Sequence, residues 1–260
     1  MIWLAASALV VVAGAALLWY ACSVPSSQVF GPALIRGPAD GRRIALTFDD
    51  GPASPFTEQI LDILRDQQVP AAFFICGRNA ERHPELLRRI SAEGHAIGNH
   101  TYSHLFPYLM TRAQMAQEID RAQLVIEKVT GRRPVLFRPP YGARWFGLYP
   151  VLRERGLKVV QWSDPGYDWK EDEDSIVRLS LERLGPGSII LLHDGLEGYE
   201  GFWRQTLRRW NAIQMPAPSP EATAAPPPDR TCIVRALPRI IEGARKAGLR
   251  FVPLQDFIPA

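Results

Sequence analysis

Two adjacent carboxylates, Asp49 and Asp50, stand at the end of the apolar run Ile44 to Phe48 and directly before Gly51-Pro52. An apolar run that ends in acids and a turn is typical of a buried strand that delivers charged side chains to the rim of a sheet. Carboxylates this close repel one another unless a positive charge lies between them. A bound metal would relieve the repulsion, and two solvated acids in a strand-end turn are the alternative.

Two histidines, His100 and His104, lie four positions apart, just after the short apolar run His95 to Gly98. On a helical turn this spacing puts both side chains on one face, as a metal requires. With the carboxylate of Asp50 they would supply two nitrogens and one oxygen, the ligand set of a catalytic zinc site with one position left for water. The alternative for the spacing alone is a satisfied or exposed histidine pair.

Further polar residues follow other expected strands. Arg138 follows the run Val135 to Phe137 and precedes a stiff Pro-Pro turn, Asp168-Trp169 follows a strand that ends at Trp162, and His193 follows an apolar run that begins at Ser188. Each residue alone could be a surface ion pair, a core aromatic or a strand-end residue. Their common position at strand ends is hard to explain by core packing.

Strand and helix patterns alternate along the chain, which predicts an α/β fold with a parallel sheet, open or closed into a barrel. Function is then expected at the carboxyl ends of the strands. Strands are predicted at 44–48, 69–76, 95–98, 135–137, 158–162, 188–192 and 249–252, and helices at 56–67, 84–93, 111–130, 146–155, 174–184 and 233–247.

The alternation fails over residues 196–230. Six prolines fall within residues 215–228, which predicts an extended surface loop rather than a separate domain. The aromatic residues Tyr199, Trp203 and Trp210 of this loop could stack on sugar rings or could anchor the loop.

Composition excludes several classes of protein. The chain of 260 residues is 47% hydrophobic, enough for one sizeable α/β domain, and its net charge of +3 is too small to indicate nucleic-acid binding. Cys22, Cys76 and Cys232 are widely spaced, which argues against a disulfide framework and against a thiolate zinc site. Nothing in the sequence requires a protein partner.

The segment Ile2 to Cys22 contains no charged residue, and its 21 positions match the roughly 20 that a membrane-spanning helix needs. We therefore expect a transmembrane segment or signal anchor over residues 1–22 and a tether over residues 23–41. A signal peptide cleaved near Cys22 and a lipid-modified Cys22 are the alternatives. The first basic residue after the segment is Arg36, so charge does not establish the orientation.

Taken in order, the polar segments resemble the polysaccharide deacetylases of the NodB-homology type, also called carbohydrate esterase family 4. The resemblance covers about residues 42 to 257, and it implies a distorted, incomplete (β/α) barrel for a domain at 42–258. The five motifs that carry it are Thr47-Phe-Asp-Asp-Gly-Pro52, His100-Thr-Tyr-Ser-His104, Arg138-Pro-Pro-Tyr-Gly142, Asp168-Trp169 and Leu191-Leu-His193.

The resemblance implies a role for each matching residue. Asp50, His100 and His104 would bind a divalent metal, usually zinc, while Asp49 would be the general base and Arg138 would hold it. His193 would be the general acid. Asp168 would orient that acid, and the backbone N–H of Tyr141 would stabilise the oxyanion. Trp169 and Leu191 would form the walls of the pocket for the acetyl methyl group. Asp164 is the alternative partner of His193.

The implied activity is that of a metal-dependent hydrolase of linear amides that removes N-acetyl groups from N-acetylglucosamine units. Peptidoglycan is the expected polymer, and chitooligosaccharides and O-acetylated xylan are alternatives. A non-catalytic glycan-binding module is the alternative from another class, but such a module would not need a base, an acid and a metal together. Because the expected substrate lies outside the cytoplasm, we expect an extracytoplasmic domain, anchored in the membrane or secreted after cleavage.

Overall fold

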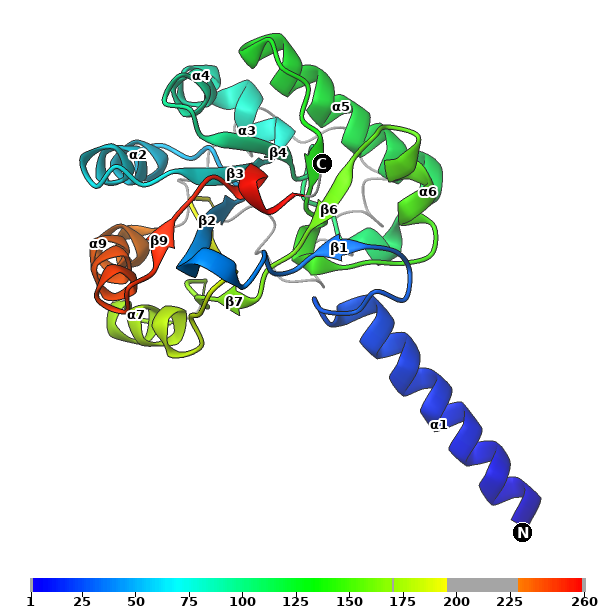
Figure 1. The fold of residues 1–260 in the computed structure, drawn as a ribbon. Coiled ribbons are helices and arrows are strands. Elements are labelled where there is room, and N and C mark those ends of the chain that lie inside the picture. Colours follow the sequence, from blue (N-terminus) through cyan, green and yellow to red (C-terminus); the bar gives the residue numbers. More distant parts are fainter. Residues whose placement is uncertain (1, 170, 196–228, 259–260) are drawn as a thin grey trace.

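A curled sheet of parallel strands forms the centre of the protein (Figure 1). The structure is a computed structural model that describes residues 2–169, 171–195 and 229–258, without the side chains of residues 2–6 and 8. The strand order is β1-β6-β5-β4-β3-β2-β8-β7, with β9 beside β2. The strands are β1 (Ala33–Leu34), β2 (Arg43–Asp49), β3 (Ala71–Ile75), β4 (Ala96–Asn99), β5 (Leu136–Phe137), β6 (Lys158–Val160), β7 (Asp164–Pro165), β8 (Ile189–His193) and β9 (Arg250–Phe251).

Helices surround the sheet, so the strands are covered from outside (Figure 1). They are α2 (Phe56–Asp66), α3 (Gly77–Arg82), α4 (Pro84–Ala92), α5 (Arg112–Thr130), α6 (Leu148–Arg153), α7 (Glu173–Glu182) and α9 (Thr231–Lys246). One further helix, α1 (Ile2–Ser23), lies apart from the sheet. Helix α2 buries Ile60, Leu61 and Leu64 against the sheet, as their helical spacing predicts. The α/β class and the parallel, incomplete barrel are therefore confirmed.

The central strand β2 is buried along almost its whole length. It pairs in parallel with β3 and β8, so that Asp49 lies level with Phe74 on one side and His193 on the other. A parallel strand that is buried on both faces has a continuous apolar sequence, which is why the segment before Asp49 was recognisable as a strand. This register brings the carboxylates of β2 and the end of β8 to one edge of the sheet.

Most predicted elements lie within two or three residues of their observed ends. A capping box begins α5: the Thr111 side chain accepts from the N–H of Gln114, and the Gln114 side chain accepts from the N–H of Thr111. Three of the helices and strands named above that begin after residue 23 were not predicted. The helix α3 and the two-residue strands β1 and β7 are too short to show a period of their own.

The segment expected as a tether over residues 23–41 makes specific contacts with the domain. Its strand β1 pairs in parallel with β6, and the N–H of Gly37 donates to the carbonyl of Gly187 at 2.7 Å. The fully buried guanidinium of Arg144 donates to the carbonyls of Val24 and Ser27. A strand of two residues carries no periodic signal, and these partners lie over a hundred positions away in the chain.

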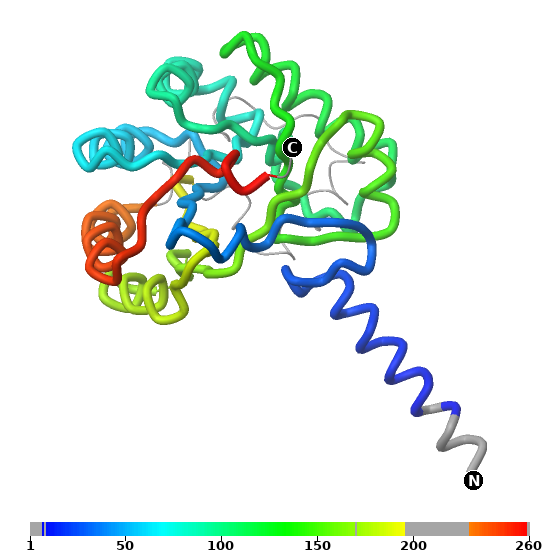
Figure 2. The backbone as a smooth tube through the Cα atoms, in the orientation of Figure 1, coloured from blue at the N-terminus to red at the C-terminus, as the bar shows by residue number. Residues whose placement is uncertain are grey.

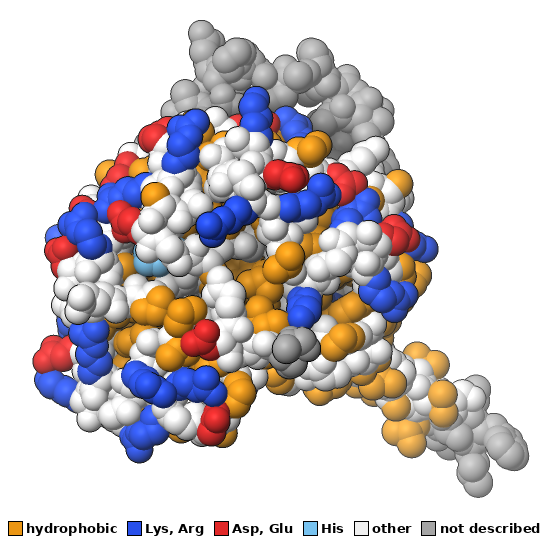
Figure 3. Space-filling model, turned by 45° about the horizontal axis from the view of Figure 1, so that its top comes forward, with side chains coloured by type: hydrophobic (Ala, Val, Ile, Leu, Met, Phe, Trp, Pro, Cys, Tyr) orange, Lys and Arg blue, Asp and Glu red, His pale blue; other side chains and the backbone are white. Residues whose placement is uncertain are grey.

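Helix α1 projects away from the body of the protein and carries the N-terminus at its far end (Figure 2). Hydrophobic side chains line its described part (Figure 3). Among the residues that the structure describes, however, no helix has both the length and the apolar character needed to cross a bilayer. The span expected over residues 1–22 therefore has no structural support.

Lys and Arg side chains alternate with Asp and Glu over the face shown in Figure 3. The described residues on this face form no continuous basic stripe, in agreement with the small net charge. The proline-rich loop predicted at about 196–230, with Tyr199, Trp203 and Trp210, lies outside the described residues up to 228.

Candidate active site

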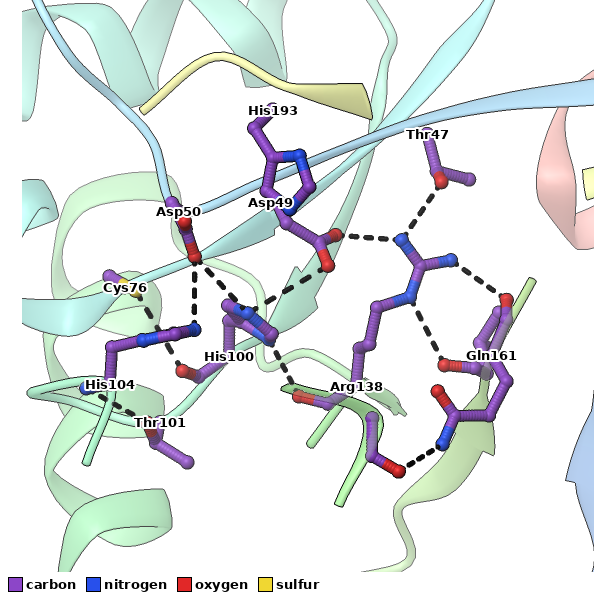
Figure 4. A network of polar contacts seen from close by, with 12 residues as sticks. Thr47, Asp49, Asp50, Cys76, His100, Thr101, His104, Arg138, Gln161 and His193 are labelled. Atoms are coloured by element: carbon purple, nitrogen blue, oxygen red, sulfur yellow. Dashed lines mark hydrogen bonds and ion pairs between the residues drawn. The ribbon is translucent and has the colours of Figure 1, made fainter. Parts of the chain in front are cut away.

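Polar side chains from four parallel strands converge at the carboxyl edge of the sheet (Figure 4). Asp49 ends β2 and Asp50 follows it, His100 follows β4, Arg138 follows β5 and His193 ends β8. Four of these residues are buried, and His193 is partly exposed. The strand-end positions noted in the sequence thus correspond to one site in space.

Asp50, His100 and His104 form a compact group of ligand atoms. The Nε2 atoms of His100 and His104 lie 3.3 Å and 3.2 Å from Oδ1 of Asp50. One potential ligand atom from each residue lies within 4.8 Å of the others. Among the described residues, this is the one group of three or more His, Cys, Asp or Glu side chains that could hold a metal ion. The two nitrogens and one oxygen predicted from the sequence are therefore brought together.

The protonation of this group suits a bound cation. Nδ1 of His100 lies 2.7 Å from the carbonyl oxygen of Arg138, which can only accept, so Nδ1 donates and Nε2 is the nitrogen left to face a cation. Burial lowers the pKa of His104 to about 4, which keeps that ring neutral. Burial by itself raises the pKa of Asp50, but His104, His100 and His193 outweigh it and hold the pKa well below its usual range.

Two buried atoms of the group lack the hydrogen bonds that buried polar atoms normally make. Oδ1 of Asp50 and Nδ1 of His104 have no hydrogen-bond partner among the described residues. An ionised oxygen without a donor is costly in a protein interior. A metal at the side facing His100 and His104 would supply the missing partner of Oδ1, so the residues present fit a divalent cation.

The two histidines do not lie on a helical turn, and that prediction is wrong. Residues 100–106 form a loop after β4, in which Thr101 and His104 adopt left-handed conformations with φ of 65° and 51°. Asp50 is also left-handed, with φ of 76°. Strained backbone of this kind concentrates at functional sites, where surrounding contacts hold it. Both carboxylates of the turn lie beside His100, whose Nε2 is 3.8 Å from Oδ2 of Asp49 and 3.3 Å from Oδ1 of Asp50.

Arg138 binds the carboxylate of Asp49 through the oxygen that does not face His100. Its Nη1 donates to Oδ1 of Asp49 at 2.7 Å and to Oγ1 of Thr47 at 2.8 Å, while its Nη2 donates to the carbonyl of Gln161 at 2.9 Å. The guanidinium lies over the ring of Phe74 and is fully buried. Burial lowers the pKa of Arg138, whereas the charge of Asp49 opposes that shift. Asp49 is thereby fixed, with Oδ2 on the side of His100.

His193 contacts Asp168 rather than Asp164. Nδ1 of His193 lies 2.8 Å from Oδ1 of Asp168, and the His193 N–H donates to Oδ2 of the same carboxylate at 2.8 Å. Asp164 pairs instead with Arg36 at 3.4 Å. Burial by itself lowers the pKa of His193, but the charge and hydrogen bond of Asp168, with smaller contributions from Asp50 and Asp49, raise it to about 9. The ring is therefore an imidazolium at neutral pH.

Aromatic and apolar side chains border the site. The ring of Trp169 meets that of His193 edge-on at 5.2 Å, and Leu191 lies buried two residues before His193. On the other side, Tyr141 packs against His104 with ring centroids 4.7 Å apart, and its backbone is left-handed, with φ of 58°. All three residues predicted to border the substrate thus lie beside the polar group.

Two buried ionisable residues of the site were given no role from the sequence. Arg230 binds Asp168, and Asp194 accepts from Oγ1 of Thr57 at 2.7 Å. Burial raises the pKa of Asp194 to about 7, although the hydrogen bond from Thr57 opposes the shift. Asp194 adjoins His193 and could have been recognised by its position, but Arg230 stands 62 positions from Asp168 and carries no local signal.

Gly51 allows the Asp49-Asp50 turn to pack against β8. A Cβ at this position would collide with the carboxylate of Asp194. We predict that Gly51→Ala lowers the free energy of unfolding by about 1–3 kcal/mol, because overpacking a buried site costs this much, and that it reduces activity. Gly185→Ala is the control: its Cβ would meet only Nη1 of Arg36, at 3.9 Å. Equal thermal stability of the two variants would contradict the prediction.

The comparisons agree with this geometry. The family sequence profile described as polysaccharide deacetylase matches residues 36–160. A peptidoglycan-N-acetylglucosamine deacetylase of Bacillus cereus is 32% identical over 225 residues, which are 85% of this chain and 90% of that protein. A chitooligosaccharide deacetylase of Azorhizobium caulinodans is 41% identical over 58% of this chain and 73% of its own length.

Solved structures show the same fold. The crystal structure of the Bc1960 peptidoglycan N-acetylglucosamine deacetylase aligns with a TM-score of 0.71 and 32% identity, covering 86% of this chain and 91% of that one. A second peptidoglycan-N-acetylglucosamine deacetylase of Bacillus cereus is 39% identical over 63% of this chain, but the chain spans only 60% of its length.

Proposed function

This chain belongs to the polysaccharide deacetylase family, and we propose that it is a metal-dependent hydrolase that removes N-acetyl groups from the N-acetylglucosamine units of peptidoglycan. The observation that carries the proposal is the combination of a buried cation site, a fixed carboxylate and a protonated histidine within one rim. Deacetylation of an amide needs a base for water and an acid for the departing amine, and the rim supplies both.

Asp49 is the proposed general base. Arg138 occupies its Oδ1 at 2.7 Å, which leaves Oδ2 to take a proton from the attacking water. The fixed cation also holds the carboxylate still, so the proton acceptor does not need to reorganise during the reaction. Bound to Asp50, His100 and His104, a divalent metal would lower the pKa of a coordinated water toward ~7 and polarise the acetyl carbonyl. We propose zinc, which favours this nitrogen and oxygen ligand set.

His193 is the proposed general acid. Because Asp168 binds its Nδ1, the proton that can be given to the leaving amine nitrogen is the one on Nε2. Asp168 also stabilises the imidazolium, so the acid is charged before the substrate arrives. We further propose that the Tyr141 N–H stabilises the developing oxyanion, and that Trp169 and Leu191 enclose the acetyl methyl group.

The pH dependence of activity should reveal this acid. The raised pKa keeps His193 protonated at neutral pH. On the alkaline side, kcat/KM is therefore expected to fall as the pH rises through this pKa, about 9. The stability that the raised pKa of His193 reflects is fully present below the ordinary value of 6.5 and is lost as the pH rises from there through about 9. In His193→Gln the alkaline decline should disappear along with most of the activity. A decline centred at the ordinary value of 6.5 in the wild-type protein would contradict the assignment.

Substrate choice is tested by measuring acetate release from peptidoglycan, chitin oligomers and acetylated xylan side by side. Peptidoglycan is expected to give the highest kcat/KM. The similarity to a chitooligosaccharide deacetylase favours chitin oligomers as the second candidate. Release from none of the three would contradict the deacetylase proposal and would favour a glycan-binding module.

We also propose that the domain acts outside the cytoplasm, because its expected substrate lies there. Protease treatment of intact cells should then degrade the domain, and complete protection would contradict the location. Fractionation of the same cells distinguishes attachment through residues 1–22 from release after cleavage.

A further inference from the structure

Arg230 is a buried arginine that contacts both members of the Asp168–His193 pair. Its side chain is 2% exposed, and its Nη2 forms an ion pair with Oδ2 of Asp168. Nη1 donates to the backbone carbonyl of Asp168 at 2.8 Å, while Nε and Nη2 donate to the backbone carbonyl of His193 at 3.2 Å and 3.1 Å. One planar guanidinium therefore binds a carboxylate and two backbone carbonyls.

These contacts join three separate parts of the fold. Asp168 lies in the loop between β7 and α7, His193 ends β8, and Arg230 immediately precedes α9. Two hydrogen bonds, from the N–H and Nδ1 of His193, join His193 directly to the carboxylate of Asp168. A shift of the loop that carries Asp168 would therefore move the carboxylate and release the imidazole of His193, unless a third group held both segments in place. Arg230 is placed to do so.

Helix packing alone does not account for a buried arginine. Arg239, on the same helix α9, pairs with Glu173 and Asp174 at 2.9 Å and 2.7 Å, yet its side chain is 47% exposed. An exposed pair of this kind suffices to join α9 to α7. Burying Arg230 costs desolvation that an ion pair often fails to recover, so a buried pair is weak support for a purely stabilising role.

We propose that Arg230 is a positioning residue for the proton-donating step: by binding the Asp168 carboxylate and the His193 carbonyl together, it keeps the imidazole of His193 directed into the site. The inference rests on the proposed function, in which His193 is the acid. Because Arg230 acts through these two residues and lies behind them, its loss should reduce kcat and leave KM nearly unchanged.

The test compares Arg230→Met and Arg230→Lys with the control Arg239→Met in the full-length, zinc-loaded protein. Arg230→Met should lower kcat by roughly 10- to 100-fold, the range expected when a catalytic group is misplaced by about 1 Å, with KM changed less than about threefold. Arg230→Lys should recover part of the loss, because an ammonium can pair with Asp168 but cannot form the same planar fork. Arg239→Met should behave as wild type.

A second measurement does not depend on turnover. The proton between Nδ1 of His193 and Asp168 should give a far-downfield proton NMR signal, assigned by its loss in His193→Gln. We expect the signal to be weakened or lost in Arg230→Met, partly restored in Arg230→Lys and unchanged in Arg239→Met. If wild-type protein releases no acetate, the proposed function fails, and the signal still tests whether Arg230 positions the pair.

Three outcomes would overturn the inference. The first is an unchanged NMR signal in Arg230→Met, and the second is an equal loss of kcat in Arg230→Met and Arg239→Met. The third is a loss confined to thermal stability, with normal kcat at a temperature where the variant is folded. If Arg230→Met does not fold, Arg230→Lys carries the same comparison, and a wild-type kcat and signal in that variant would then contradict the need for the guanidinium.

Discussion

Asp49→Asn should abolish most turnover while the metal remains bound. An amide cannot take a proton from water, and loss of a general base typically costs about 10²- to 10⁴-fold in rate. Asp50, His100 and His104 are unchanged in the variant, so its zinc content should equal that of the wild-type protein. The measurement is kcat for acetate release together with metal content by elemental analysis.

The variant also tests whether the loss reflects chemistry or unfolding. Asn is close in shape to Asp, and its oxygen can still accept from Arg138, whose bonds to Thr47 and to the Gln161 carbonyl do not involve Asp49. Arg138 does lose a buried ionic partner, so some decrease in melting temperature is expected. Asp66→Asn makes the same chemical change at an exposed ion pair and is the control. Undiminished acetate release from Asp49→Asn would remove Asp49 from the mechanism.

The residues at strand ends were predictable because of the way parallel sheets are built. Each strand of an α/β fold ends at the same edge, so a polar residue that follows an apolar run is already placed near the others. Asp49, His100, Arg138 and His193 each satisfy that rule, and the structure brings them together. The metal-ligand role of His100 was inferred from residue type and spacing, whereas the roles of Asp49, Arg138 and His193 followed from the family resemblance, and all of these roles stay predictions.

Other features depend on tertiary contacts that leave no local pattern. The loop that carries His104 is left-handed at Thr101 and His104, a conformation that is uncommon for residues other than Gly, so its geometry could not be read from their spacing. Arg230 follows a proline-rich stretch and precedes a helix, a position that suggests only a helix boundary. The packing of residues 23–41 depends on β6 and Arg144, far along the chain.

Removal of the metal should stop the reaction and lower stability together. Without the cation, the buried Oδ1 of Asp50 faces the Nε2 atoms of His100 and His104 at 3.3 Å and 3.2 Å and has no hydrogen-bond partner among the described residues. A ligand that binds only the folded state at about 100 times its Kd adds about 2.7 kcal/mol, and each kcal/mol shifts the melting temperature by about 2–4 °C in a domain of this size. Zinc should therefore raise the melting temperature of chelator-treated protein by roughly 5–10 °C and restore turnover.

His104→Ala separates this effect from unspecific zinc binding. The variant keeps Asp50 and His100 but lacks one of the three ligands, so it should bind zinc more weakly, show a smaller thermal shift and release little acetate. His83→Ala removes a partly exposed imidazole that does not belong to this ligand group, so the variant should respond to zinc as wild type does. Activity that survives chelation, or equal zinc affinity in the two variants, would contradict a catalytic metal at Asp50, His100 and His104. A full thermal shift without any recovery of turnover would instead indicate that the metal only stabilises the fold.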